Sequence, residues 1–341
     1  MIDASLPLLQ TKLYRPRVLR GLVARPHLWA LLNRGLDKPL TLICAGPGFG
    51  KTTLVTSWLE GLAAPTDAAA PIPVAWLALD ENDNDLVAFL RYFVAALQTA
   101  IPDACSETVT LLQSSRQSST ALFTTTLIND LARLPRRTIL VLDDYSALKS
   151  AAVNDLLVAL VHNWPPPLHL VLITRHSPPL PLPTLRARGA ITELRTQQLR
   201  FSLAETTAYL EQTLGIPVDA ATVDALEQRA EGWIAGLKLA TLSLDTGAST
   251  AELVAALADL DVNVTEYLAD EVLSRQPPAV QAFLLQTSVL DHFCAALCTA
   301  VIGELAPGWD AAACIQWLVR TNLFIITLDH QNEWYRYHHL F

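Results

Sequence analysis

The sequence predicts an α/β domain built on a parallel β-sheet, followed by a helical domain and then a winged-helix domain. Through residues 1–200, short apolar runs alternate with helical patterns, which is typical of a parallel sheet with helices on both faces. Beyond Phe201 the strand signals stop, and helical periodicity continues with few breaks to about Leu318. Two strand-like runs, Leu323–Leu328 and Trp334–His338, then indicate the β-hairpin that closes a winged helix.

The same patterns define the expected elements and domains. The candidate strands are Leu40–Cys44, Val74–Leu79, Thr138–Leu142, Leu168–Ile173 and Ile191–Leu194. Helices are expected after Lys51 and near Asp85–Thr99, Ala121–Leu134 and Val153–Asn163. The Ser-, Thr- and Gln-rich segment Cys105–Ser119 is expected to be a mobile connection. A capping box of Ser202 and Glu205 is expected to start the helical half. The expected domains cover residues 1–200, 201–260 and 261–341.

A glycine-rich turn follows the first expected strand and has the composition of a phosphate-binding loop. Leu40 to Thr53 read LTLICAGPGFGKTT, which is an apolar strand, the turn and the start of a helix. Amide groups here would curl around an anion, as in P-loop NTPases, and the residues assigned to this cradle are Gly46, Gly48, Gly50, Lys51, Thr52 and Thr53. Lys51 would reach the outer phosphates, and the Thr52 hydroxyl would bind Mg²⁺. Ala45 stands where the strict pattern has glycine, and an ordinary strand–turn–helix is the alternative.

Two later strands end in charged residues that suit nucleotide chemistry. Asp143 and Asp144 close the run TILVLDD, so Asp143 would hold Mg²⁺ and Asp144 would orient or deprotonate an attacking water. A strand that ends in an Asp-rich turn is a weak signal alone, but together with the glycine loop it indicates a metal–nucleotide site. The next run ends at Arg175, which would face a γ-phosphate if its strand lies between the other two. A solvent-exposed arginine at a strand end is the alternative.

Composition excludes several classes of protein. The 341 residues suffice for two or three domains, and 51% of them are hydrophobic, with a mean hydropathy of +0.30. No apolar stretch reaches the ~20 residues of a membrane helix, and the N-terminus lacks a secretory signal. We therefore expect a cytoplasmic protein without membrane association. The formal net charge of −9 argues against direct nucleic acid binding by this chain, because binding to phosphates needs a basic surface.

Other groups have both structural and ligand-binding interpretations. The five scattered cysteines are expected to be buried thiols, because a metal site at Cys294, Cys298 and His292 lacks a fourth ligand. A solvated or nucleotide-proximal face, rather than a nucleic-acid arm, is expected for Lys12, Arg15, Arg17, Arg20 and Arg25. The acidic run Asp80–Asp85 lacks the glycine and distal glutamate of a calcium loop and is expected to cap the next helix. Core positions are expected for Trp233, Trp309 and Trp317.

Together these motifs resemble the STAND class of P-loop ATPases and, within it, the MalT-like LuxR-family transcription regulators. Similar segments are LLQTKLYRP (Leu8–Pro16), VARPHL (Val23–Leu28), AGPGFGKTTL (Ala45–Leu54), AWLALDENDND (Ala75–Asp85), LVLDDYSAL (Leu140–Leu148) and LHLVLITRHSPPLPLPTLRARG (Leu168–Gly189). They continue with LRFSLAE (Leu199–Glu205), AEGWIAGLKLA (Ala230–Ala240), DEVLSRQP (Asp270–Pro277) and WYRYHHLF (Trp334–Phe341). The resemblance covers nearly the whole chain, and the family shares Ala45. One departure is Lys238, which replaces the proline of the family's GLPLA motif.

The resemblance also implies roles for residues outside the phosphate loop. Val23 and Arg25 match the segment that frames the adenine in related proteins. His338 is similar to the winged-helix histidine that touches the β-phosphate of bound ADP. Its neighbour His339 stands where an acidic residue or proline is usual, and a histidine packed beside Trp334 is the alternative.

The function implied by the resemblance is that of a nucleotide-dependent switch. Bound ADP would hold the three domains together, exchange for ATP would allow self-association, and slow ATP hydrolysis would reset the switch. In such regulators the inducer-sensing and DNA-binding domains are C-terminal, so this chain is expected to be the front part of a longer polypeptide. The alternatives are an ordinary kinase or motor ATPase with fast turnover, and a nucleotide-locked scaffold that never hydrolyses.

Overall fold

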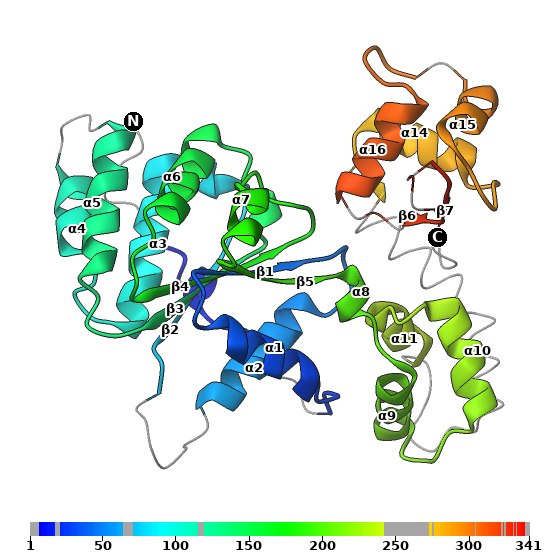
Figure 1. Cartoon of the computed structure of the whole chain (residues 1–341), viewed down its shortest axis with the longest axis horizontal. Helices are drawn as coiled ribbons and strands as arrows, with labels where there is room; N and C mark the ends of the chain where they lie inside the picture. The colour runs from blue at the N-terminus through cyan, green and yellow to red at the C-terminus, as the bar shows by residue number, and fades with distance from the viewer. Residues whose placement is uncertain are drawn as a thin grey trace. The chain divides into compact units, whose positions relative to one another are not determined.

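A computed structural model shows that the chain divides into two compact units (Figure 1). The first contains Met1–Val18, Arg25–Cys44 and Lys51–Arg195, and the second contains Leu19–Ala24, Ala45–Gly50 and Thr196–Phe341. Within them, the structure describes residues 7–17, 21–63, 71–114, 119–241, 273–274, 276–303, 305–321, 323, 325–329, 331 and 333–337.

A five-stranded parallel sheet forms the centre of the first unit, with the strand order β2-β3-β4-β1-β5. Its strands are β1 (Leu40–Cys44), β2 (Val74–Ala78), β3 (Thr138–Asp143), β4 (Leu168–Thr174) and β5 (Ile191–Arg195). All residues of β1, β3 and β4 are buried, which explains why these strands appear in the sequence as continuous apolar runs. The predicted parallel sheet is therefore confirmed, and β4 lies between β1 and β3.

Helices cover both faces of this sheet (Figure 1). In the figure, α1 and α2 lie on one face, and α3, α6 and α7 lie on the other. The helices of the first unit are α1 (Pro26–Gly35), α2 (Lys51–Ala63), α3 (Leu86–Ala100), α4 (Ser106–Gln113), α5 (Thr120–Ala132), α6 (Ala151–His162) and α7 (Leu182–Ala187). Short 3₁₀ turns are η1 (Gln10–Leu13), η2 (Glu81–Asn84) and η3 (Tyr145–Ala147).

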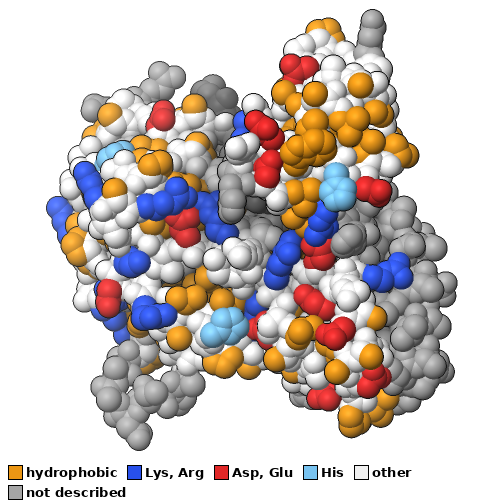
Figure 2. Space-filling view, turned by 45° about the vertical axis from the view of Figure 1, so that its right-hand side comes forward, with side chains coloured by type: hydrophobic (Ala, Val, Ile, Leu, Met, Phe, Trp, Pro, Cys, Tyr) orange, Lys and Arg blue, Asp and Glu red, His pale blue; other side chains and the backbone are white. Residues whose placement is uncertain are grey.

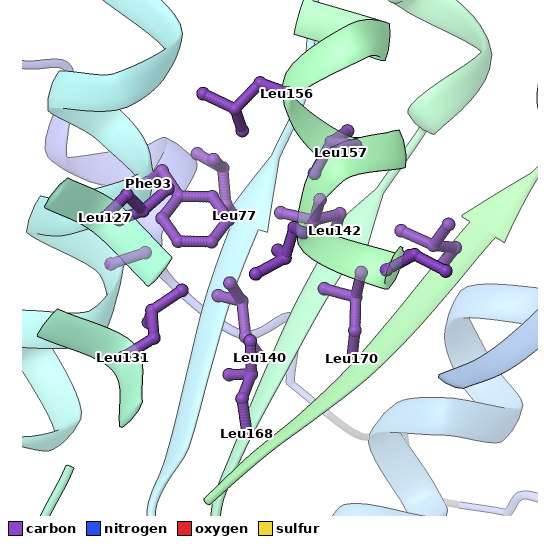
Figure 3. Close-up of a cluster of buried hydrophobic side chains, with 14 of the residues drawn as sticks. Leu77, Phe93, Leu127, Leu131, Leu140, Leu142, Leu156, Leu157, Leu168 and Leu170 are labelled. Atoms are coloured by element: carbon purple, nitrogen blue, oxygen red, sulfur yellow. The ribbon is translucent and has the colours of Figure 1, made fainter. Parts of the chain in front are cut away.

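Leucine side chains dominate the core between the sheet and α3, α5 and α6 (Figure 3). Alternate residues of a strand share one face, so Leu140 and Leu142 of β3 point the same way as Leu168 and Leu170 of β4. Phe93 of α3 packs against them. Each such side chain contributes about 1.5–3 kcal/mol on full burial, so this layer stabilises the sheet whose edge carries the candidate site.

Helix α4 corrects the expectation of a mobile connection over Cys105–Ser119. The composition of this segment favours a loop, but a buried carboxylate of α5 forms hydrogen bonds with it. Asp130 of α5 accepts hydrogen bonds from the backbone N–H of Thr108 (2.8 Å) and from its hydroxyl (2.7 Å). The two bonds satisfy the amide and the hydroxyl of a fully buried threonine, and a helix of only eight residues is thereby stabilised by tertiary contacts rather than by propensity.

From Thr196 onward, the second unit contains the helices α8 (Thr196–Leu199), α9 (Leu203–Leu214), α10 (Ala220–Ala230) and α11 (Ile234–Thr241). The predicted capping box at the start of α9 is confirmed, since Glu205 N–H donates to the Ser202 hydroxyl and Ser202 N–H donates to the Glu205 carboxylate. The part of the expected helical run at 242–272 lies outside the described residues.

The C-terminal part has three helices and a hairpin in the residues that the structure describes. They are α14 (Pro278–Thr287), α15 (Ala295–Val301), α16 (Ala311–Thr321), β6 (Ile325–Thr327) and β7 (Tyr335–Tyr337). Strands β6 and β7 pair antiparallel, as the two strand-like runs predict. Asp329 shapes the turn between them, because its carboxylate accepts the N–H groups of Glu333 (3.0 Å) and Trp334 (3.2 Å).

The acidic run is confirmed as a pair of helix caps. Asp80 accepts the N–H of Asn82 at 2.8 Å at the start of η2, and Asp85 accepts the N–H of Ala88 at 2.8 Å at the start of α3. A carboxylate at the first turn of a helix also meets the positive end of the helix dipole. The run therefore starts helices and does not form a calcium loop.

The basic N-terminal residues do not form a single solvated face, and a nucleotide-proximal role stays a prediction. The Lys12 ammonium is buried and lies 2.5 Å from Asp83 Oδ2, and the Arg25 side chain is buried as well. Arg15 is half-buried, Arg17 is exposed, and Arg20 lies outside the described residues.

Cysteine positions agree with a thiol interpretation. Cys44, Cys105, Cys298 and Cys314 are buried free thiols, and Cys294 is half-buried. Within the described ranges, no group of three or more His, Cys, Asp or Glu side chains is placed so that it could hold a metal ion. None of the helices in these ranges is both long enough and apolar enough to span a bilayer.

Candidate functional site

The glycine-rich loop joins β1 directly to α2 and has a backbone that requires glycine. Gly48 has a φ of 78° and Gly50 has a φ of 70°, in the left-handed region that strains other residues. Helix α2 begins immediately after the loop, at Lys51. Amide groups at a helix start have no intrahelical acceptor and attract anions. The predicted strand, glycine turn and helix are therefore all present and contiguous in the chain.

In the first unit, the end of β3 lies beside the first turn of α2. The Thr52 hydroxyl lies 3.1 Å from both carboxylate oxygens of Asp143. Asp144 follows with a φ of 54°, and its N–H donates to Asp143 Oδ1 at 3.0 Å. Asp143 is the last residue of β3 and is only 5% exposed. Thr52 and Asp143, predicted as magnesium ligands, are thus in direct contact.

Burial controls the ionisation of Asp143. Removal from water and, to a lesser extent, the neighbouring charge of Asp144 together raise the pKa of this carboxyl to about 6. The hydrogen bonds from Thr52 and from the Asp144 amide, and the positive charge of Lys51, act in the opposite direction. A cation bound at Asp143 would stabilise the charged carboxylate and offset the cost of its burial.

Burial shifts the pKa of Lys51 in the opposite direction, because the charged form of lysine is the protonated one. Burial and, to a lesser extent, repulsion from Arg175 together lower the pKa of its ammonium to about 8. The charges of Asp144 and Asp143 raise it and partly compensate. Because Arg175 directly follows β4, which lies between β1 and β3, all four charges meet at the carboxyl edge of the sheet.

This arrangement fits a polyphosphate with a hard divalent cation. Lys51 and Arg175 are two cations that repel each other, so a bound anion would relieve both. The Thr52 hydroxyl and the Asp143 carboxylate offer the oxygen ligands that Mg²⁺ prefers. The structure thus brings together five of the residues predicted from sequence, namely Lys51, Thr52, Asp143, Asp144 and Arg175.

Other predicted site residues stay predictions. Val23 is half-buried, and Arg25 is buried at the residue that precedes α1. Thr53 is exposed in the first turn of α2. His338 lies outside the described residues, as does His339.

Trp233 is a residue whose role the sequence did not reveal. It was expected to be a core residue at a helical position, and it is fully buried, but it precedes α11 rather than lying within it. Its indole N–H donates to the Pro47 carbonyl of the glycine loop at 3.0 Å. Two residues later, the N–H of Ala235 donates to the Gly48 carbonyl at 3.1 Å. The segment AEGWIAGLKLA contains this residue, so the family resemblance was the available signal.

Glu231 is a second residue that sequence reasoning did not single out. It ends α10 with a φ of 47°. Arg336 of β7 binds its carboxylate with two hydrogen bonds, of 2.7 and 3.0 Å, and Arg200 lies 3.5 Å away. A bidentate arginine–carboxylate pair is among the stronger polar contacts in proteins. It connects the hairpin of the winged helix to the turn that leads into Trp233.

Comparison with known protein families agrees with these features. The family described as the MalT winged helix domain matches residues 269–341. The family described as Nephrocystin 3, N-terminal, matches residues 20–175, which include the glycine loop, the strand that ends at Asp143, and the strand that Arg175 directly follows.

Curated relatives cover nearly all of this chain. The HTH-type transcriptional regulator MalT of Klebsiella pneumoniae is 31% identical over 98% of the chain, and that of Serratia proteamaculans is 33% identical over 98%. The chain spans 36% of the length of each of these relatives. Among solved structures, a Walker-type ATPase of Pyrococcus abyssi has a TM-score of 0.62 at 14% identity, with 95% of each chain covered, which shows the shared fold. Over nearly its whole length the chain is therefore similar in sequence to part of the MalT-type regulators, and it shares the fold of a Walker-type ATPase.

Proposed function

We propose that this chain is the ATP/ADP-binding switch of a LuxR-type transcriptional regulator. The observation that carries the proposal is the convergence of Lys51, Thr52, Asp143 and Arg175 at one edge of the sheet, next to a glycine loop that enters a helix. The names of the curated relatives support the regulatory role, since they are HTH-type transcriptional regulators.

The residues of the site have distinct roles in this proposal. Lys51 pairs with the outer phosphates, Thr52 and Asp143 hold Mg²⁺, and Asp144 orients the attacking water. Arg175 senses the γ-phosphate through charge-assisted hydrogen bonds. ATP supplies the transferable γ-phosphoryl group, and its slow loss resets the switch. Amides of Gly46, Gly48, Gly50 and Thr53 complete the phosphate cradle, Val23 and Arg25 frame the adenine, and His338 meets the β-phosphate of ADP.

The switch requires a ligand that favours one state. Moving a population from 1:99 to 99:1 takes about 5.5 kcal/mol of differential binding. In the ATP state, the γ-phosphate would contact Lys51 and Arg175, and the His338 contact would be lost. The difference in binding free energy that these changes produce is of the required order. We propose that domains 1–200, 201–260 and 261–341 are held together with ADP bound and that ATP permits self-association. Inducer and DNA would be bound by parts of the protein outside this chain.

Exposed apolar surface supports the self-association step. Hydrophobic side chains gather on the surface formed by the C-terminal helices (Figure 2). Leu285 at the end of α14 is 65% exposed and Val289 is 79% exposed. Further exposed side chains in this region are Leu297, Val301 and Val319. Contiguous exposed apolar surface often marks a protein–protein contact.

Calorimetric titration with ADP and ATP, with and without Mg²⁺, tests the proposal. We expect both nucleotides to bind and magnesium to strengthen the binding of ATP. Absence of heat with both nucleotides on folded protein would refute the proposal. Steady-state hydrolysis faster than ~1 per second by the monomer would favour an ordinary P-loop enzyme instead. A complete lack of hydrolysis, with tight binding, would favour a nucleotide-locked scaffold.

Binding of Mg–ADP is expected to be strongest between pH 6 and pH 8, the two values to which burial shifts the pKa of Asp143 and of Lys51. Below this window Asp143 becomes protonated and cannot hold the metal, and above it Lys51 loses its charge. In the ligand-free protein, folding favours the neutral form of both side chains. The stability that neutral Asp143 contributes is lost as pH rises through its raised pKa, and the stability that neutral Lys51 contributes is lost as pH falls through its lowered pKa. The two charged groups therefore lower the free energy of unfolding between these pKa values, and a bound ligand stabilises the protein most in this range. Titrations across the pH range check this, and an affinity that stays constant through both pKa values contradicts it.

Removal of the Arg336–Glu231 pair is expected to increase self-association of the ADP-bound protein. Arg336→Gln removes both hydrogen bonds to Glu231 and leaves Arg200 to neutralise that carboxylate. The winged helix then loses one contact to the turn after α10. Sedimentation velocity with saturating ADP measures the effect. Arg320→Gln, which changes an exposed arginine of α16, is the matched control, and equal sedimentation of the two variants would refute the expectation.

A further inference from the structure

The contacts of Trp233 explain how the glycine loop is held in shape. A phosphate-binding loop directs successive N–H groups to one side. Its carbonyl groups then point to the other side, and where they are buried they need donors of their own. Pro47 is buried in this loop, and the donors to its carbonyl and to that of Gly48 come from Trp233 and Ala235.

Each of these hydrogen bonds orients a whole peptide group. In a trans peptide the C=O and the N–H point in opposite directions, and none of the described peptide bonds is cis. The carbonyl of Pro47 and the N–H of Gly48 belong to one peptide group, so the Trp233 indole turns the Gly48 N–H away from itself. The Ala235 N–H does the same for the peptide group between Gly48 and Phe49. Two consecutive amides thus face the opposite side of the loop, where an anion would bind.

Close packing makes this arrangement rigid. A Cβ atom at Gly48 would lie 2.4 Å from Trp233 Nε1 and 2.7 Å from Ala235 Cβ, so the indole touches the loop backbone. The turn that carries Trp233 is itself held. Gly232 has a φ of 68°, and its carbonyl accepts the N–H of Phe201 at 2.9 Å. Trp233 N–H donates to Ala230 O at 2.8 Å.

We infer that Trp233 is a positioning residue of the phosphate loop, which orients the Pro47–Gly48 peptide so that its amide meets a polyphosphate. The inference rests on the proposed function and deepens it. Phosphate bound at the Gly48 N–H polarises the same peptide group and makes the Pro47 carbonyl a stronger acceptor. The indole hydrogen bond therefore tightens when the loop is occupied, so the segment that enters α11 senses the state of the loop directly.

Trp233→Phe tests this inference, because phenylalanine keeps an aromatic ring at the position and lacks the indole N–H. We expect the Kd for ADP to rise about tenfold, since the Pro47 carbonyl loses its donor and the loop must be ordered by the ligand. The matched control is Trp164→Phe. The Trp164 indole also donates to a carbonyl at 3.0 Å, that of Leu168, at the start of β4. This contact is remote from the glycine loop, because Cys44, which directly precedes the loop, pairs with Thr174 at the opposite end of β4. The control variant should bind ADP as the wild type does.

A spectroscopic measurement separates positioning from packing. The protein has eight tryptophans, and the ¹⁵N–¹H indole signal missing from Trp233→Phe identifies Trp233. In the wild type, ADP or inorganic pyrophosphate should shift this proton signal downfield, while the Trp164 signal stays in place. If Trp233→Phe does not fold, Phe variants of the other tryptophans identify the signal by elimination, and the wild-type shift decides.

The possible outcomes are distinguishable. A stationary Trp233 signal in wild-type protein that binds ADP would overturn the inference and leave the proposed function intact. Unchanged ADP affinity in folded Trp233→Phe would have the same consequence. Failure of the wild type to bind both ADP and pyrophosphate would overturn the inference and the proposed function together.

Discussion

Lys51→Ala is expected to abolish the thermal stabilisation that ADP and ATP give to the wild-type protein. The ammonium group stands at the first residue of α2, directly after the glycine loop, and burial and Arg175 lower its pKa to about 8. At neutral pH the group is still charged and is poorly solvated, so a phosphate anion would stabilise its charged form. Loss of such a charge-assisted contact costs about 3 kcal/mol, or roughly a hundredfold in affinity.

Thermal unfolding with and without saturating nucleotide measures this effect. The unfolding temperature without nucleotide serves as a control for the effect of the substitution on folding. Because the pKa of Lys51 is lowered, its charged ammonium reduces the stability of the ligand-free protein at neutral pH. Lys51→Met, which keeps the aliphatic chain, should unfold without ligand at or above the wild-type temperature. Lys238→Ala, at an exposed position of α11, should respond to nucleotide as the wild type does. A Lys51 variant that nucleotide still stabilises would remove the assignment of the phosphate loop.

Lys12→Met is expected to reduce the free energy of unfolding by about 3–5 kcal/mol, the usual cost of leaving one partner of a buried ion pair. The ammonium group lies 2.5 Å from Asp83 Oδ2 and 3.2 Å from Asp80 Oδ2, and 4.3 Å from the centre of the Tyr92 ring. Asp83 is 0% exposed, and its Oδ1 has no hydrogen-bond partner among the described residues. Without Lys12, this carboxylate would remain buried with only the Asp80 N–H, at 2.8 Å, to stabilise it.

Urea denaturation measures this loss, and Lys149→Met is the control. Lys149 pairs with Glu81 at 3.2 Å, but the two side chains are 75% and 80% exposed, so its removal should cost less than about 1 kcal/mol. The double variant Lys12→Met, Asp83→Asn should regain much of the lost stability, because it removes the uncompensated charge. Equal stabilities of Lys12→Met and Lys149→Met would show that the buried pair does not hold the N-terminal turn η1.

Much of the first unit could be predicted because its signals are local. The fully buried strands β1, β3 and β4 are nearly continuous apolar runs, and the charged residues that follow in the chain could be found in the same way. Parallel strands share an orientation, so residues at their carboxyl ends meet at one edge whichever order the strands take. Lys51 and Asp143 could therefore be assigned to one site before the strand order was known, whereas Arg175 needed β4 to lie between β1 and β3.

Helix α4 and Lys12 could not be predicted by the same reasoning. The composition around Thr108 favours a loop, and a lysine near a chain end usually faces solvent. The segment around Thr108 is helical because Asp130 of α5 accepts the hydrogen bonds of the Thr108 amide and hydroxyl. Lys12 is buried because Asp83 provides a buried carboxylate of opposite charge.

The sequence by itself determined the strand, glycine turn and helix of the phosphate loop, the acidic strand end and the helix caps. These depend on torsion angles and side-chain periodicity within a few residues of each other. Only the tertiary structure decided that Trp233 donates to Pro47, which lies 186 positions away, and that Arg336 binds Glu231. It also decided the pKa values of Lys51 and Asp143, since burial and neighbouring charges exist only once distant segments have packed together.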